Sequence, residues 1–254
     1  MRKSNLFIGK EEKEIKYLLE ESLSLEKVFD FFKSIGFYRV RIENQKDVYW
    51  DDTNLTITNY KRGLRLRFVD RVLVSVEFKS LFERHDGSRL VEEVSLMKDG
   101  KYDFEKLKWI LVERMGVVSV DKWKKMSPSG NDIERVLSDL GLSPEISLIK
   151  KRTVFEAEGK EVEVGVDQIQ GINTHLEIEN KDGEMIVFDE LVAKIENKFP
   201  KAARVKYGYL DLIFQRNPKI LSKEFFEEKY KSNYSWNVQT GEKEYVNKLL
   251  SQKG

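Results

Sequence analysis

Apolar and charged residues alternate along several short segments of the chain, and this period of two is typical of β-strands. Around Ile15, Glu14 and Lys16 share one face of an extended chain, whereas Ile15 and Tyr17 share the other. The pattern predicts about eight strands joined by turns. They are expected at residues 6–17, 37–50, 64–69, 72–80, 89–96, 146–157, 160–169 and 174–180, with a short strand at 55–59 and a last one at 203–214.

Apolar residues three and four positions apart predict helices between the strands. Ser24 can cap the start of the first helix, and Gly36 can end it. Pro200 ends the helix that precedes the last strand. The helices are predicted at residues 24–35, 103–115, 131–140 and 188–199, and in the tail at 223–230 and 242–250.

The charged positions of the predicted strands are sorted by sign. The first strand and a late strand carry carboxylates two residues apart, and strands between them carry cations at the same spacing. One such strand alone is typical of a sheet whose polar face lies in water. The recurrence over five strands favours a shared site for a metal-bound polyphosphate. The pairs are Glu12 with Glu14, Arg65 with Arg67, Glu77 with Lys79, Lys150 with Arg152, and Glu177 with Glu179.

Composition narrows the class of protein. The 254 residues suffice for one large domain or two small ones. Lys and Arg number 45 against 44 for Asp and Glu, so the net charge of +1 attracts neither nucleic acid nor an anionic membrane. The absence of cysteine excludes disulfides and thiolate sites. The apolar run at 6–8 is too short for a signal peptide, and no run reaches membrane-spanning length, so we expect a cytoplasmic protein.

The familiar phosphate-binding and hydrolase motifs are absent. The sequence contains no P-loop and no dinucleotide-binding glycine motif, and neither His85 nor His175 belongs to a metalloprotease motif. Chemistry is therefore expected from carboxylates, cations and a bound metal. Carboxylate oxygens suit Mg²⁺ or Mn²⁺ better than zinc. Eight strands is also roughly the size at which a closed barrel holds side chains or one small ligand.

Several segments of the sequence resemble a known protein family. The segment Glu12-x-Glu14-x-Lys16 is similar to the E-x-E-x-K signature of the CYTH superfamily, also called the triphosphate tunnel metalloenzymes. Later segments resemble the family in the same order, at 45–51, 64–67, 77–79, 150–152, 167–179 and 206–213. The chain departs from the family pattern in strand five, where Val91 stands in the middle of R-x-E-x-E, and at Asn173, where the family has glycine.

The resemblance implies a fold and a site. The fold is α+β, an eight-stranded antiparallel closed β-barrel that forms a tunnel, with helices outside and a helical insertion. Lys16 and Tyr49 are implied to assist the leaving group or proton transfer. The implied phosphate-binding residues are Lys16, Arg65, Arg67, Lys79, Arg89, Lys150, Arg152 and Lys206. The implied ligands of Mg²⁺ or Mn²⁺ are Glu12, Glu14, Glu93, Asp167, Glu177 and Glu179.

Three functions follow from the resemblance, because the family includes thiamine triphosphatases, inorganic triphosphatases and class IV adenylyl cyclases. The first is a metal-dependent triphosphatase acting on a triphosphate-bearing small molecule. The second is an adenylyl cyclase that makes cyclic AMP from ATP. The third is a non-catalytic polyphosphate-binding protein. Assays with tripolyphosphate, thiamine triphosphate and ATP separate them.

The expected domain organisation is a barrel domain at 1–216 followed by a helical tail at 217–254. The barrel domain is expected to carry a helical insertion at 97–145. The insertion and the tail are longer than the family pattern requires. They are interpreted as packing elements, with a cover over the tunnel mouth and a homodimer contact as the alternatives.

Overall fold

The computed structural model describes residues 10–59, 62–83, 89–98, 100–170, 172–181, 185–205 and 208–209. The chain divides into two compact units, Met1–Arg204 and Val205–Gly254. Of the second unit the structure describes only Val205, Gly208 and Tyr209. The predicted tail helices at 223–230 and 242–250 therefore lie outside the described residues.

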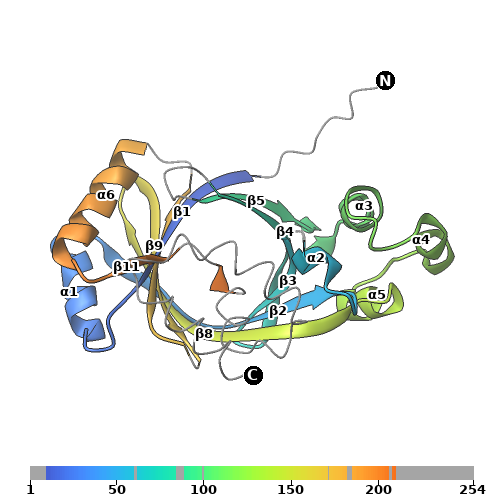
Figure 1. Ribbon diagram of the computed structural model, residues 1–254, viewed down its shortest axis with the longest axis horizontal. Helices are drawn as coiled ribbons and strands as arrows, with labels where there is room; N and C mark the ends of the chain where they lie inside the picture. The colour runs from blue at the N-terminus through green and yellow to red at the C-terminus, as the bar shows by residue number, and fades with distance from the viewer. Residues whose placement is uncertain are drawn as a thin grey trace, which may run out of the picture. The chain divides into compact units, whose positions relative to one another are not determined.

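A large antiparallel sheet forms the centre of the first unit (Figure 1). Its strands follow the order β10-β9-β8-β2-β3-β4-β5-β1-β11, and β1 also pairs with β10, from Lys13 opposite Asn180 to Leu18 opposite His175. The alternating segments of the sequence thus fold as strands, as predicted, except that only residues 203–205 of the last predicted strand, 203–214, form a strand, and residues 206–207 and 210–214 lie outside the described part of the chain. The strands are β1 (Lys10–Leu18), β2 (Tyr38–Asp51), β3 (Arg62–Val69), β4 (Val72–Glu83), β5 (Arg89–Ser95), β8 (Ser143–Ala157), β9 (Lys160–Ile169), β10 (His175–Asn180) and β11 (Ala203–Val205).

Helices flank this sheet on two sides (Figure 1). Among the described residues they are α1 (Leu25–Ser34), α2 (Thr56–Asn59), α3 (Phe104–Lys108), the π-helix η1 (Trp109–Arg114), α4 (Val120–Met126), α5 (Ile133–Asp139) and α6 (Met185–Lys198). A two-stranded hairpin, β6 (Met97–Lys98) and β7 (Lys101–Tyr102), precedes α3. The fold is α+β, as predicted. Within the described part of the chain, every helix is too short or too polar to cross a membrane.

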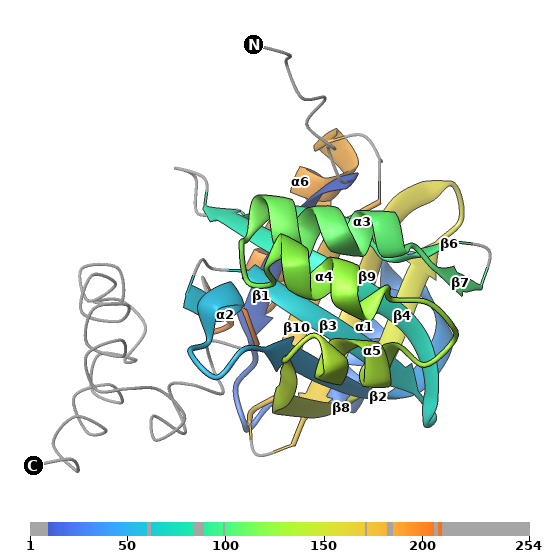
Figure 2. The ribbon, with the colours of Figure 1, turned by 90° about the vertical axis from the view of Figure 1, so that its right-hand side faces the viewer.

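Two apolar cores lie between the sheet and the helices. One packs α1 and α6 against β1, β8, β9 and β10, with Phe32 and Phe188 fully buried. The other packs α3, α4 and α5 against β2, β3 and β4, through residues such as Leu64, Leu66 and Phe78. Figure 2 shows these three helices in front of the strands. Since the apolar positions of each strand face the helices, the alternate positions face the other side of the sheet.

Two predictions of secondary structure are wrong. A strand was predicted at 55–59, but residues 56–59 form α2, because Asp51 accepts hydrogen bonds from the backbone of Ile57 (2.9 Å) and Thr58 (2.8 Å). Asp52 accepts another from the Thr56 amide at 2.9 Å, so the two carboxylates hold the first turn of the helix. Helix α4 lies between the helices predicted at 103–115 and 131–140, where no helix was predicted. Its start is capped by the Ser119 side chain, which accepts a hydrogen bond from the Lys122 amide.

Candidate functional site

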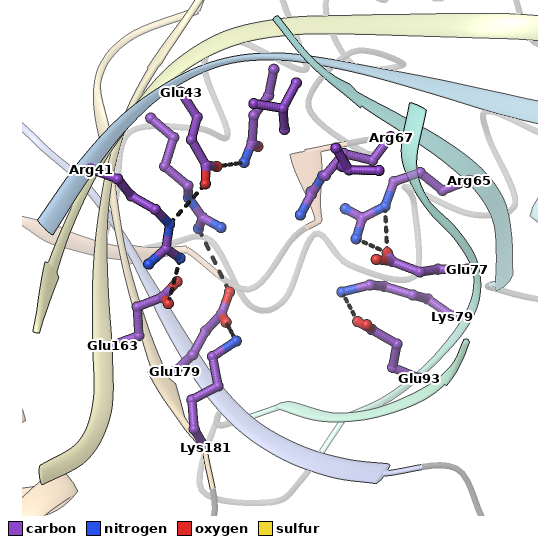
Figure 3. Close-up of a pocket in the computed structure, with 14 residues that line it drawn as sticks. Arg41, Glu43, Arg65, Arg67, Glu77, Lys79, Glu93, Glu163, Glu179 and Lys181 are labelled. Atoms are coloured by element: carbon purple, nitrogen blue, oxygen red, sulfur yellow. Dashed lines mark hydrogen bonds and ion pairs between the residues drawn. The ribbon is translucent and has the colours of Figure 1, made fainter. Parts of the chain in front are cut away.

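A charged pocket of about 220 Å³ lies on the face of the sheet opposite the helices. Figure 3 shows its labelled side chains directed from the surrounding strands toward one space. They come from alternate positions of each strand, as the period of two requires. The lining residues are Arg41, Glu43, Gln45, Arg65, Arg67, Val69, Val74, Glu77, Lys79, Glu93, Arg152, Glu163, Glu179 and Lys181.

Two arginines of β3 are held by two buried carboxylates. Arg67 donates to both oxygens of Asp47, from Nε to Oδ1 (2.7 Å) and from Nη2 to Oδ2 (2.8 Å). Arg65 donates from Nε to Oε2 of Glu77 (2.9 Å) and from Nη1 to Oδ2 of Asp47 (3.2 Å). Next along β4, Lys79 pairs with Glu93 of β5. The carboxylates fix the guanidinium planes and offset the cost of burying their charge.

A second group of ion pairs comes from β8, β9 and β10. Asp167 is fully buried and accepts from Lys150 Nζ (3.0 Å) and Arg152 Nε (2.9 Å). The other end of the Arg152 guanidinium pairs with Glu177, and its Nη2 lies 3.6 Å from Glu179 Oε1. Asp167 therefore positions two cations.

Three carboxylates converge where β1 meets β10. Glu14, Glu177 and Glu179 are buried, and each offers one oxygen within 4.8 Å of the others. Lys16 Nζ lies 2.8 Å from Glu14 and 2.5 Å from Glu177. Lys181 Nζ lies 2.5 Å from Glu179 Oε2. The register places Glu14 opposite Glu179 and Lys16 opposite Glu177, so the cluster follows directly from the pairing of these strands.

Burial and neighbouring charges shift several pKa values. Burial opposes the ionisation of Asp47 and Glu179, but adjacent cations outweigh it. Arg65 and Arg67 hold the pKa of Asp47 well below its usual range, and Arg152 and Lys181 lower the pKa of Glu179 to about 2. Both groups are thus carboxylates at neutral pH.

The pKa values of two groups beside the pocket shift mainly because these groups are desolvated. Burial, with Arg152 nearby, lowers the pKa of Lys150 to about 8. Burial also raises the pKa of Tyr49, so its phenol keeps its proton at neutral pH.

The structure brings most of the expected site residues together. Lys16, Arg65, Arg67, Lys79, Lys150, Arg152, Glu14, Glu93, Asp167, Glu177 and Glu179 all belong to the pocket or to the ion pairs beside it. Tyr49 is on β2 opposite Arg65 and is not a lining residue. For Glu12 and Arg89 only the backbone in β1 and β5 is described, and Lys206 lies outside the described residues.

The roles of several residues at the site were not predicted from the sequence. Glu77 was noted only as one of the charged pairs, and Asp47 was not assigned to the site, although both occupy alternate positions on charged strands and hold the arginines. Arg41 was missed as well; it bridges Glu43 (2.8 Å), Glu156 (2.9 Å) and Glu163 (2.8 Å). Glu43 lies two residues away on the same strand, but Glu156 and Glu163 come from β8 and β9, so spacing within one segment could not reveal these two partners.

The sequence of residues 10–204 matches the CYTH domain family. This chain belongs to the CYTH family. The match covers the sheet, the flanking helices and the charged pocket. No curated protein matches the sequence of this CYTH protein.

Several solved structures are similar to this CYTH protein at low sequence identity. A putative adenylyl cyclase from Hippeastrum, HpAC1, is 17% identical with a TM-score of 0.53, over 79% of this chain and 94% of that one. A putative adenylate cyclase from Vibrio parahaemolyticus is 16% identical with a TM-score of 0.50, over 81% and 98%. PH1819 from Pyrococcus horikoshii is 20% identical with a TM-score of 0.49, over 81% and 99%.

Proposed function

We propose that this CYTH protein is a divalent-metal-dependent triphosphatase that hydrolyses a triphosphate-bearing small molecule in its charged pocket. One observation carries the proposal. The cations Arg65, Arg67, Lys79 and Arg152 line the same cavity as Glu179, which belongs to the cluster of three buried carboxylates. Phosphoryl transfer requires mainly positioning and neutralisation of charge, and this combination supplies both.

The sheet would act as a closed eight-stranded tunnel around the phosphate chain. The ladder between β1 and β10 supports this, because it joins the strands that stand first and eighth in the sheet order. A closed interior limits access of water to the ion pairs. It therefore strengthens their interaction with a bound anion.

Arg65 and Arg67 would bind the phosphate oxygens, with Lys79 and Arg152 beside them. The planar guanidinium group suits two parallel hydrogen bonds to a phosphate. Asp47 and Glu77 accept some of the hydrogen bonds that the two arginines can donate, and they keep the arginines charged and oriented. An anion entering the pocket would share these cations with the carboxylates, so the cations need little rearrangement.

Glu14, Glu177 and Glu179 fit a divalent cation. Their oxygens are close enough for one ion, and carboxylates are the ligands that Mg²⁺ and Mn²⁺ prefer. We assign the metal to these three residues, and we assign Asp167 and Glu93 to positioning cations. When bound, such a metal would neutralise phosphate charge and lower the pKa of a bound water.

Lys16 and Tyr49 are the proton donors that we assign to the leaving group. Lys16 Nζ lies between two of the clustered carboxylates, 2.8 Å from Glu14 and 2.5 Å from Glu177. Tyr49 stays protonated because burial raises its pKa. Either group can hold a proton near an oxygen that gains charge as the bond to phosphorus breaks.

Release of phosphate from tripolyphosphate, thiamine triphosphate and ATP with Mg²⁺ or Mn²⁺ tests the proposal. We expect turnover that chelation with EDTA abolishes. Glu14→Gln should lower kcat by about 100-fold or more, because it removes a charge that the transition state needs. The matched control is Glu161→Gln, at an exposed position of β9, which should keep wild-type activity. Full activity of Glu14→Gln would contradict the proposal.

An adenylyl cyclase is the second candidate, because the similar Vibrio parahaemolyticus protein is described as a putative adenylate cyclase. The similar Hippeastrum protein is also a putative adenylyl cyclase, but its dominant activity is that of a triphosphatase, which favours the hydrolase. Products from ATP separate the two, since a cyclase yields cyclic AMP and pyrophosphate. Binding of triphosphates without turnover would instead indicate the polyphosphate-binding protein. The cytoplasmic location and the homodimer stay predictions.

A further inference from the structure

Gln45 is a buried lining residue of the pocket with an unused acceptor. Its side chain is 3% exposed, and its Oε1 has no hydrogen-bond partner among the described residues. The amide nitrogen donates to Glu43, and Glu43 in turn accepts from Arg41 Nε at 2.8 Å. This fixes which end of the amide is the oxygen, because rotating it would place oxygen against the Glu43 carboxylate.

An unpaired buried acceptor is costly, and it is unexpected in a pocket otherwise suited to phosphate. Leaving a buried polar group unpaired destabilises a protein, because the group loses its hydrogen bonds to water and gains none in return. A phosphate chain cannot satisfy Gln45 Oε1, because its ionised oxygens are acceptors too. The acceptor therefore indicates a ligand group that donates a hydrogen bond.

Apolar side chains lie next to this acceptor. Val69 pairs directly with Gln45 across β2 and β3, and both Val69 and Val74 line the pocket. Val74 is 47% exposed, although valine on a strand is usually covered. Val69 and Val74 thus present apolar surface to a pocket that is otherwise charged, and a ligand group with apolar surface would cover it.

The pocket can hold only part of an organic triphosphate. At about 220 Å³ it is smaller than the roughly 300–1,000 Å³ of pockets that enclose a whole drug-sized ligand, so such a ligand would extend beyond it. The arginines and Lys79 occupy the part that suits a phosphate chain, whereas Gln45 and the valines suit a neutral group with a donor. An inorganic tripolyphosphate would leave the second part unfilled.

We infer that Gln45, Val69 and Val74 form the subsite for the organic group of a triphosphate ester. Gln45 Oε1 accepts a hydrogen bond from a hydroxyl or amino group of that organic part, and the valines pack on its apolar surface. The substrate class is thus an organic triphosphate such as a nucleoside triphosphate, in preference to inorganic tripolyphosphate. This inference rests on the proposed function, since it names the substrate class for the same pocket.

Dissociation constants of ATP and tripolyphosphate, measured by calorimetry in the presence of Ca²⁺, test the subsite. For Gln45→Met, which keeps the side-chain length but removes the acceptor, we expect ATP to bind about 3- to 10-fold more weakly. Tripolyphosphate should keep its affinity within about twofold, because it makes no contact with the acceptor. Gln170→Met, the same change at an exposed residue, should alter neither constant.

The valines give an independent pair of variants. Val74→Ser should weaken the binding of ATP but not that of tripolyphosphate. Val72→Ser, at a 64% exposed neighbour that does not line the pocket, should change neither affinity. A 2′,3′-dideoxynucleoside triphosphate identifies the donor. If Gln45→Met no longer affects its binding, the donor is a ribose hydroxyl; if the effect remains, the donor is a base amino group.

The outcomes separate this inference from the proposed function. An equal loss of affinity for ATP and for tripolyphosphate in Gln45→Met and in Val74→Ser would mean that these residues have a merely structural role. It would overturn the subsite. A wild-type protein that binds tripolyphosphate more tightly than every organic triphosphate would also overturn it, while the triphosphatase would stand. Failure of all triphosphates to bind would remove the proposed function and the subsite together.

Discussion

At the scale of single residues, the carboxylates that position the arginines matter as much as the arginines themselves. Arg65 and Arg67 were predicted from their spacing, but Asp47 was not. A charge pattern along one strand shows which side chains share a face. It does not show which partner on the next strand holds them. The β2–β3 register supplies that information by placing Asp47 opposite Arg67.

Replacing Asp47 by Asn should destabilise the protein strongly. Asp47 is 1% exposed and holds both guanidinium groups, so the variant leaves two buried cations with less compensation. Breaking a buried pair on one side typically costs about 3–5 kcal/mol in the free energy of unfolding. Denaturant unfolding measures this cost. Asp70→Asn, at an exposed position of the β3–β4 turn, is the matched control and should change stability by less than about 0.5 kcal/mol.

The difference between wild type and Asp47→Asn should also depend on pH. The folded pKa of Asp47 lies below the ordinary value of 3.8, so its stabilisation is fully present above that value. It is lost as the pH falls toward the folded pKa, because the unfolded chain then binds the proton first. Urea midpoints of the two proteins should therefore approach each other below about pH 4. A gap that stays constant down to about pH 2 would contradict this origin.

At the scale of elements, alternation predicted the strands well because the two faces of this sheet have different environments. Side chains on one face pack against helices, and side chains on the other face form ion pairs around the pocket, so apolar and charged residues alternate strictly. Helix α2 was missed because residues 55–59 carry no helical period, and the Asp51 and Asp52 side chains determine its conformation. Nor does the sequence indicate where strands lie beside one another: the β1–β10 ladder joins segments far apart in the chain.

A glycine on β9 provides the space for an arginine side chain of β8. Gly165 lies on β9, and a Cβ atom there would come within 2.6 Å of Arg152 Nη2 and 2.7 Å of its Nε. The guanidinium cannot retreat freely, because Asp167 and Glu177 hold it. Glycine at this position thus allows Arg152 to lie across the neighbouring strand.

Gly165→Ala should therefore impair the site through Arg152. Displacing the guanidinium breaks charged hydrogen bonds worth about 1.5–3 kcal/mol each, so kcat/KM should fall roughly 10- to 100-fold. Arg152→Met should cause a similar or larger loss. The two changes act on one interaction, so the double variant should be no worse than Arg152→Met alone. Losses that multiply in the double variant would show that Gly165 acts independently of Arg152.

At the scale of the whole molecule, the sheet separates two kinds of interior. Apolar cores on its helical side supply stability, and the charged side supplies a site in which every cation of the two described networks has a carboxylate nearby. Such a balanced interior is stable without ligand. In the proposed function it would accept a metal and an anion together, because their charges largely offset each other. A carboxylate of the three-carboxylate cluster should then repel the anion in the absence of metal and attract the metal-bound anion.

Glu179 offers the sharpest test of this balance, because it both lines the pocket and belongs to the carboxylate cluster. Glu179→Gln removes one negative charge. It should therefore bind metal-free tripolyphosphate about 5- to 10-fold more tightly than wild type, and the Mn²⁺ complex of tripolyphosphate more weakly by a similar factor. Calorimetric titrations in EDTA and in Mn²⁺ measure both. Glu161→Gln, exposed on β9, should leave both affinities unchanged. A change of the same sign in both titrations would show that Glu179 contributes only to the general potential of the pocket, and would remove it from the metal site.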